Sequence, residues 1–213
     1  MKKKEACPVY SASNTPKCIT KQLPFLTSTD HWMPMTRHCL TGSGWLFTQT
    51  IRAGQQAGGI WLVMQDSRGY PAMADGDVMT LAVIESVDWL SQQQIQVHIA
   101  TLSFGRIMRS SDAPAQPTRL TGQLYGGWSP SSVSLAADDV LITRLHQWQA
   151  EFGLVWPEWV TNQTPLCANW VCLRWLELLP LSLKTKQRLL KQPSARNCLR
   201  YLKKVIRQSD RYH

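Results

Sequence analysis

The sequence lacks the features that mark membrane and secreted proteins. No apolar run approaches the ~18 residues that a membrane helix needs. The first residues, MKKKEACPVYSASN, are basic, but no apolar stretch follows them as it would in a signal peptide. We therefore expect a cytoplasmic protein whose thiols are reduced and which has no membrane partner.

The cysteine and glycine patterns exclude two common kinds of site. None of the six cysteines belongs to a CxxC pair, and no pair of histidines follows the nearest spacing, CANWVC at 167–172. No Gly is followed by Lys, so the sequence has no P-loop to hold nucleotide phosphates. We expect no metal and no cofactor, and most cysteines to be small buried residues.

Acidic residues are scarce near the C-terminal end. The chain of 213 residues has 23 Lys and Arg against 14 Asp and Glu, a net charge of +9. Residues 184–213 hold ten of the basic residues and a single acid, Asp210, which leaves 13 of each sign in residues 1–183. The whole excess of positive charge therefore belongs to the last thirty residues.

The first 125 residues have the pattern of short β-strands. Three segments are rich in Val, Ile, Leu, Thr and aromatic residues: 58–65, 78–90 and 94–110. In the third, Ile95, Val97 and Ile99 alternate with polar residues, which is typical of a strand with one buried face. Segments with Gly and Asp separate the strands, and 120–128 follows as a closing strand. The pattern predicts a small barrel or sandwich.

From about residue 129 the apolar residues recur at helical spacing. Four helices are predicted: 138–153, 165–180, 183–191 and 195–208. Pro180 ends the second helix, and Ser182 is a suitable N-cap for the third. In the fourth, apolar residues line one face and basic residues the other. The chain therefore divides into a β domain, 1–128, and a helical subdomain with a basic tail, 129–213.

The element order and several motifs resemble the Lon protease N-terminal (substrate-binding) domain family, which includes stand-alone bacterial proteins without an ATPase. The most specific match is WVCLRWLELLPLSLKTKQRLLK (170–191), which is close to the family's WVxxRLAELLPLPLxxKQxLLE. Residues 23–40 can be laid on a family segment that ends in a short helix, and GSGWLF (42–47) on a turn and strand. The resemblance implies an α+β fold, with a PUA-like β pseudo-barrel followed by a C-terminal α-helical bundle.

The resemblance also implies a function. In full-length Lon this region binds unfolded or tagged polypeptide and does no chemistry, so we expect a non-enzymatic, polypeptide-binding module linked to proteolysis or protein quality control. Most candidates for its surface are aromatic residues, because these are enriched at interface hot spots. The barrel candidates are Pro24, Phe25, Trp32, Trp45 and Trp61, and the helical candidates are Trp156 and Trp159.

Two further features need a choice between chemistry and structure. Asp30, His31, His38 and Cys39 are side chains of a zinc site or a Cys–His nucleophile. On a helix, however, His31 and His38 would lie ~10 Å apart, so we predict a loop and short helix that pack on the barrel. Trp170 and Trp175 lie ~140° apart on one predicted helix, and we expect that they do not share a core.

The basic residues of the last helix support a second functional hypothesis. Arg200, Lys203, Lys204 and Arg207 would share one helix face, which is the electrostatic pattern of RNA- or DNA-binding proteins. The simpler alternative is a helix face that is only solvated.

Overall fold

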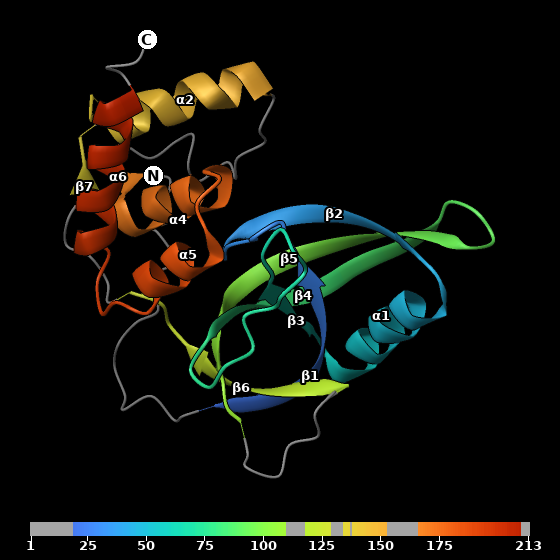
Figure 1. The fold of residues 1–213 in the computed structure, drawn as a ribbon. Coiled ribbons are helices and arrows are strands. Elements are labelled where there is room, and N and C mark those ends of the chain that lie inside the picture. The colour runs from blue at the N-terminus through green and yellow to red at the C-terminus, as the bar shows by residue number, and fades with distance from the viewer. Residues whose placement is uncertain (1–18, 110–117, 129–133, 137, 153–165, 210–213) are drawn as a thin grey trace, which may run out of the picture.

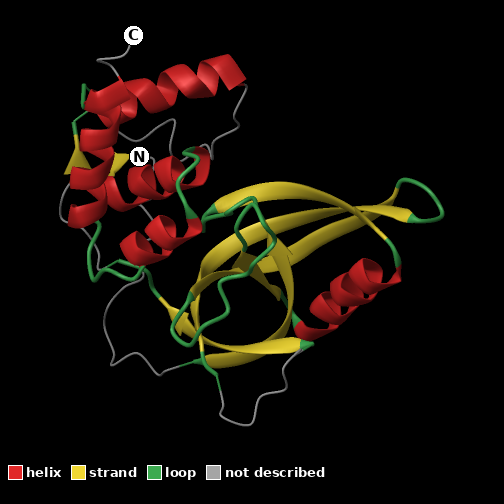
Figure 2. Cartoon of the chain, viewed as in Figure 1, coloured by secondary structure: helices red, strands yellow, loops and turns green. Residues whose placement is uncertain are grey.

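The computed structural model describes residues 19–109, 118–128, 134–136, 138–152 and 166–209. Its fold is mixed α+β, as the sequence predicts, with a β part followed in the chain by a group of helices (Figures 1 and 2). None of the helices in these ranges combines the length and hydropathy that crossing a membrane requires.

The β part is one sheet that closes on itself. Its strands are β1 (Thr20–Ser28), β2 (Thr36–Ser43), β3 (Ile60–Met64), β4 (Val78–Trp89), β5 (Gln94–Ile107) and β6 (Arg119–Tyr125). Their order is β2-β5-β4-β3-β1-β6, and β6 also pairs with β5, so five strands form a ring. Only the β1–β3 pair of this sheet is parallel. The strands predicted at 58–65, 78–90, 94–110 and 120–128 are confirmed.

Strand β2 lies outside the ring. It pairs in antiparallel register with the first half of β5, from Thr36 opposite Thr101 to Ser43 opposite Gln94. The second half of β5 pairs with β6 and completes the ring. Because no other strand in the described ranges pairs with β2, its second edge is open there.

Trp61 is fully buried in the core inside the ring, which it shares with Met79 and other apolar residues. A Cβ atom at Gly105 or Gly122 would come within 2.6 Å of its ring, so only glycine leaves room for the indole at these positions. Ile60 and Leu62 point to the opposite side of β3 and belong to the core under helix α1 (Trp45–Ala57). Burial on both sides explains why every residue of this strand is apolar.

Helix α1 begins where the sequence predicted a strand. Gly44, with φ of 88°, precedes the helix, and Gly58, with φ of 73°, ends it in the left-handed region. The strand predicted at 42–47 is therefore wrong beyond Ser43. A short apolar run such as Trp45–Phe47 fits either element, because periodicity cannot separate a strand from a helix over three residues.

Residues 23–40 form two strands and a bend, not a strand and a short helix. Strand β1 ends at Ser28 and β2 begins at Thr36. Between them Pro34 disfavours a helical preceding residue, and Met35 has a φ of 69°, which a right-handed helix excludes. The predicted short helix is wrong. Strand β1 is followed by the bend and by strand β2, and helix α1 comes only after β2.

The helical part covers one end of the ring (Figure 1). It contains α2 (Val140–Phe152), α4 (Ala168–Leu178), α5 (Leu183–Leu190), α6 (Arg196–Ser209) and the short antiparallel pair of β7 (Ser134–Leu135) and β8 (Leu166–Cys167). Two predicted helix ends are confirmed: Leu179, before Pro180, is extended, and the Ser182 hydroxyl accepts a hydrogen bond from the Thr185 amide at 3.3 Å.

Helix α4 is buried on all sides. Trp170 and Trp175 are 1% and 2% exposed, and both belong to one core that also contains side chains of α2, α6 and the end of the barrel. The expectation that these two rings do not share a core is therefore wrong. An angle of ~140° separates two side chains only when one face of the helix is solvated, and here α4 has neighbours around its whole circumference.

Candidate functional site

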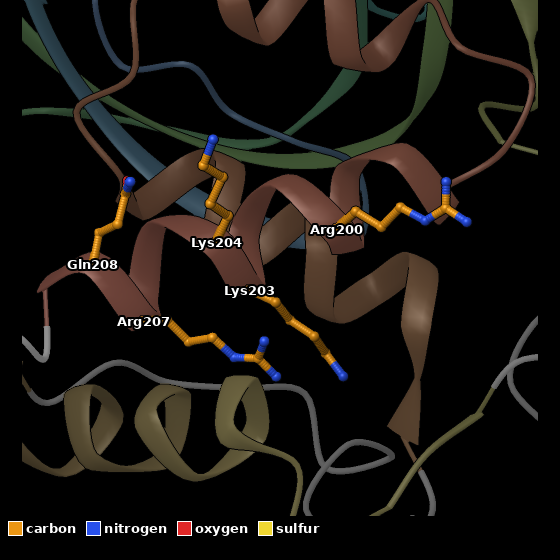
Figure 3. Close-up of a pocket in the computed structure, with 5 residues that line it drawn as sticks. All are labelled: Arg200, Lys203, Lys204, Arg207 and Gln208. Carbon is orange, nitrogen blue, oxygen red and sulfur yellow. The ribbon is translucent and has the colours of Figure 1, made fainter.

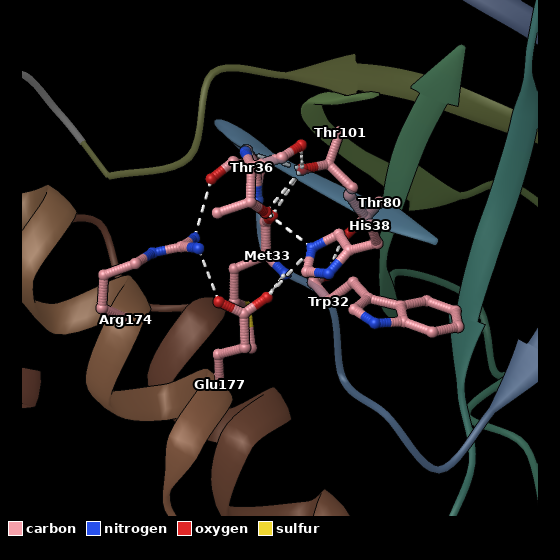
Figure 4. A network of polar contacts seen from close by, with 9 residues as sticks. Trp32, Met33, Thr36, His38, Thr80, Thr101, Arg174 and Glu177 are labelled. Carbon is pink, nitrogen blue, oxygen red and sulfur yellow. Dashed lines mark hydrogen bonds and ion pairs between the residues drawn. The ribbon is translucent and has the colours of Figure 1, made fainter. Parts of the chain in front are cut away.

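Backbone and side-chain polar groups of residues 33–38 lie at a joint between the sheet and α4 (Figure 4). The Nη2 of Arg174 donates to the backbone oxygen of Pro34 at 2.8 Å, and its Nη1 donates to Glu177 Oε2. Glu177 Oε1 accepts from the backbone amide of Met33 at 3.1 Å and lies 3.4 Å from His38 Nε2. These contacts bind α4 to the bend between β1 and β2.

The charge of Glu177 is maintained inside this joint. Burial alone would raise the pKa of its carboxyl group, but the guanidinium of Arg174 and the hydrogen bond with His38 act in the opposite direction. The net effect is a pKa below the usual range of a glutamate. A carboxylate and a guanidinium therefore form a buried ion pair, with Arg174 only 3% exposed.

Asp30, His31, His38 and Cys39, the residues that suggested a metal or nucleophile site, do not form such a site. His31 is buried, and its Nε2 donates to the backbone oxygen of Gln65 at 2.8 Å. Burial lowers the pKa of His31, because it disfavours the charged imidazolium. Asp30 and Cys39 are exposed. Within the described ranges no group of three or more His, Cys, Asp and Glu side chains has the arrangement of a metal site.

Helix α5 adds two buried polar side chains to the joint. The side-chain nitrogen of Gln187 donates to the backbone oxygen of Val78 at 2.7 Å, and its side-chain oxygen accepts from the backbone amide of Val78 at 2.8 Å. The Gln187 side chain therefore pairs with β4 much as a neighbouring strand would. Lys186 is 4% exposed, and burial lowers its pKa to about 8. Three polar residues of the motif at 170–191, Arg174, Glu177 and Gln187, therefore attach the helices to the barrel.

The residues predicted to bind polypeptide have different environments. Pro24 and Trp61 are buried, and Phe25 and Trp32 are half-buried. Trp45, the first residue of α1, is 75% exposed. Trp156 and Trp159 lie outside the described residues, and their role stays a prediction.

Trp45 belongs to a group of exposed apolar residues at one end of the sheet. Leu46 is 74% exposed, and at the tip of the β4–β5 hairpin Trp89 and Leu90 are 65% and 52% exposed. The start of α1 and this hairpin tip lie at the same end of the molecule, on the right of Figure 1. We call these four residues the apolar end.

The strand register relates Trp89 to the start of α1. Trp89 is opposite Ile95 in β5, and Ile95 is opposite Gly42 in β2. Directly opposed residues share a face of the sheet, so Trp89 extends a row that crosses all three strands. Gly42 has no side chain of its own, and the Phe47 ring occupies that space, within 2.4 Å of where a Cβ would stand. Trp45 and Leu46 precede Phe47 in α1.

Sequence reasoning did not select Leu46, Trp89 or Leu90. The available signal was the sequence VDWLSQQQ, in which two large apolar residues precede a polar turn between two predicted strands. A hairpin tip is normally exposed, so an apolar pair there indicates a contact surface.

The four basic residues of the second hypothesis do share a surface. Arg200, Lys203, Lys204 and Arg207 line a shallow hollow on α6, together with Gln208 (Figure 3). One of them has a protein partner: Lys203 Nζ lies 2.6 Å from Asp139 Oδ2, at the start of α2.

Comparison with known proteins bears on the fold. The Lon N-terminal domain protein from Xanthomonas campestris is similar at 20% identity and a TM-score of 0.59, over 85% of this chain and 96% of that one. The N-terminal domain of the Lon protease of the Mycobacterium avium complex is similar at 15% identity and a TM-score of 0.52, with the same coverage. No family model and no curated protein matches the sequence. The chain therefore has the fold of Lon N-terminal domains, which confirms the resemblance of its motifs at the level of fold.

Proposed function

We propose that this chain, which has the fold of Lon N-terminal domains, is a polypeptide-binding module without a reaction of its own. The observation that carries the proposal is the apolar end: Trp45, Leu46, Trp89 and Leu90 are each more than half exposed at one end of the sheet. Exposed groups of large apolar side chains mark interaction sites, and tryptophan is the residue most enriched at interface hot spots.

The open edge of β2 adds a backbone site beside the apolar end. In an antiparallel strand with one neighbour, every second residue directs its N–H and C=O away from that neighbour. Over the eight residues of β2 this provides about four donors and four acceptors for an added strand. An extended polypeptide paired with β2 would reach Trp45 and Leu46 just beyond Ser43.

The chemistry of these two features defines the polypeptide. Main-chain pairing needs an extended segment that is not already folded, and the apolar end favours large apolar side chains in it. Unfolded chains expose such segments. The proposal includes a PUA-like pseudo-barrel as the rigid scaffold and a link to proteolysis, in which the module holds unfolded chains that are destined for a protease.

The test measures the affinity of this protein for a fluorescent, reduced and carboxymethylated α-lactalbumin, which is permanently unfolded. The double variant Trp45→Ala, Trp89→Ala should bind at least about tenfold more weakly, a loss of ~1.4 kcal/mol. Its free energy of unfolding should change little, because both rings are exposed. The matched control is Tyr70→Ala, Met108→Ala, which removes two other exposed apolar side chains and should bind normally.

A second measurement tests the edge of β2. A short peptide that binds is compared with the same peptide N-methylated at alternate amides. N-methylation removes the donors that pairing with β2 requires, so one of the two alternate patterns should abolish binding. The proposal is wrong if the unmodified protein does not bind unfolded polypeptide, or if the control variant loses as much affinity as the Trp45 and Trp89 variant.

A further inference from the structure

Helices α5 and α6 present a face with positive charge and no acid. Between Glu177 and Asp210 the sequence contains no Asp or Glu and nine basic residues: Lys184, Lys186, Arg188, Lys191, Arg196, Arg200, Lys203, Lys204 and Arg207. Three of these have structural roles, since Lys186 is buried, Lys191 pairs with Asp77 and Lys203 pairs with Asp139. The other six are exposed.

Exposed cations of α5 and α6 line two hollows. The first, of about 400 Å³, is lined by Arg200, Lys203, Lys204, Arg207 and Gln208 (Figure 3). The second, of about 280 Å³, is lined by Arg188, Leu189, Gln192, Asn197 and Tyr201. Asn197, Tyr201, Lys204 and Gln208 follow one another at intervals of four, three and four residues. They therefore form one stripe along α6, which joins the two hollows.

We propose that this surface binds the sugar–phosphate backbone of single-stranded nucleic acid. Arg188, Arg200, Lys204 and Arg207 would contact phosphates, because arginine and lysine are the residues that neutralise them. In the described part of the chain none of these four is paired with a carboxylate, so no ion pair has to be broken before a phosphate binds.

The side chains between the cations favour nucleic acid over an acidic peptide. Gln192, Asn197 and Gln208 supply amides, which hydrogen-bond to phosphate and sugar oxygens. Tyr201 is half-buried beside them and offers a ring on which a base can stack. A chain of carboxylates has no aromatic ring that would stack on this side chain.

The orientation of α6 argues against a membrane as the partner. A helix that binds at a bilayer surface inserts its apolar face between the lipids. Here that face is already occupied, since Cys198, Leu202 and Ile206 are buried in the core with α2 and α4. Only the polar face of α6 is available to a partner.

The experiment measures the affinity for a fluorescent 20-nucleotide single-stranded RNA, and for the DNA of the same sequence, between 50 and 200 mM KCl. Four phosphate contacts predict that the logarithm of the association constant falls with log [salt] at a slope near −2.8. This slope corresponds to about a 50-fold loss of affinity over the range. The variant Arg200→Gln, Lys204→Gln, Arg207→Gln should bind at least tenfold more weakly and reduce the slope toward −0.7. Lys203 is left intact, because its pairing with Asp139 supports the fold.

The matched control is Arg52→Gln, Arg68→Gln, Arg119→Gln. It removes the same charge from exposed positions on α1, on the β3–β4 connection and on β6, and it should keep its affinity within about threefold. If the α6 variant unfolds, Arg207→Gln alone replaces it and should lower the slope by ~0.7. Tyr201→Leu should weaken single-strand binding and leave binding to the matching duplex unchanged.

Several results would overturn the proposal: no binding at 50 mM KCl, an equal loss in the control, or tighter binding of poly-glutamate or of vesicles with anionic lipid than of either nucleic acid. The proposal is independent of polypeptide binding. The Trp45 and Trp89 variant should bind RNA normally, and the α6 variant should bind unfolded polypeptide normally, so failure of one proposal does not imply failure of the other.

Discussion

The guanidinium of Arg174 donates a 2.8 Å hydrogen bond to the backbone oxygen of Pro34, and this contact ties helix α4 to the bend between β1 and β2. The same guanidinium pairs with Glu177, which in turn accepts from the amide of Met33. The Arg174 side chain therefore holds α4 against the bend between β1 and β2. Two polar residues of the motif that resembles Lon, Arg174 and Glu177, therefore have a structural role at this joint, whereas exposed Arg188 of the same motif belongs to the proposed nucleic-acid surface.

Replacing Arg174 by Met should destabilise the protein by about 3–5 kcal/mol, because the carboxylate of Glu177 would stay buried without its counter-charge. Urea unfolding at pH 7 measures the change. Adding Glu177→Gln should restore at least ~1 kcal/mol, since an amide is neutral and its oxygen can still accept from Met33. The control is Arg37→Met, which breaks the exposed pair with Glu85 and should cost less than ~1 kcal/mol. Equal losses in the two arginine variants would contradict the buried role of Arg174.

Replacing Gln187 by Leu should cost roughly 2–4 kcal/mol. The substitution keeps the size of the side chain but leaves the amide and the oxygen of Val78 without a partner in a buried site. Hydrogen exchange should locate the change, with faster exchange of the Val78 amide than in the unmodified protein. A stability within ~0.5 kcal/mol of the original would show that another group or water satisfies Val78.

Stability should rise as the pH increases from about 8 to about 10. The pKa of Lys186 is lowered to about 8 in the folded protein by burial, whereas an unfolded lysine titrates near 10.4. Between these values the unfolded chain binds more protons, and stability increases with pH wherever that holds. Lys186→Met should remove this rise and should be more stable than the original protein at pH 7. Urea unfolding at pH 7, 8, 9 and 10 decides between these outcomes.

Replacing Gly42 by Ala should disturb the apolar end. The new methyl group would meet the Phe47 ring at 2.4 Å, so the start of α1 has to move, at a cost of about 1–3 kcal/mol. Because Trp45 precedes Phe47 by two residues, the affinity for unfolded polypeptide should fall as well. Gly126→Ala is the matched control, since its methyl group meets no atom within 4 Å. If binding is unchanged in a destabilised Gly42 variant, the position of α1 does not matter for the surface.

Local patterns were sufficient to predict most of the elements. The alternation of Ile95, Val97 and Ile99 predicts β5, and Ser182 and Pro180 mark helix ends that the structure has at these positions. Such signals depend on backbone chemistry within a few residues, so they survive in any tertiary context. The two faces of α6 were predicted for the same reason.

Two of the wrong predictions concern places where the contacts are distant in the sequence. The bend at 29–35 is held by Arg174 and Glu177, about 140 residues further along the chain. Trp170 and Trp175 share a core because α2, α6 and the barrel surround α4. A helical projection of α4 shows only the angle between the two rings, and it contains nothing about these neighbours.

The sequence by itself determined the α+β order, the basic face of α6 and the motif at 170–191, because each depends on residues within one or two turns of helix or one strand. Only the tertiary structure decided which aromatic residues are available to a partner. Trp61 is enclosed by Gly105 and Gly122 from other strands, while Trp45 and Trp89 are both exposed at one end of the sheet. Exposure depends on what the rest of the chain places against a side chain, and that is set by the register of strands far apart in the sequence.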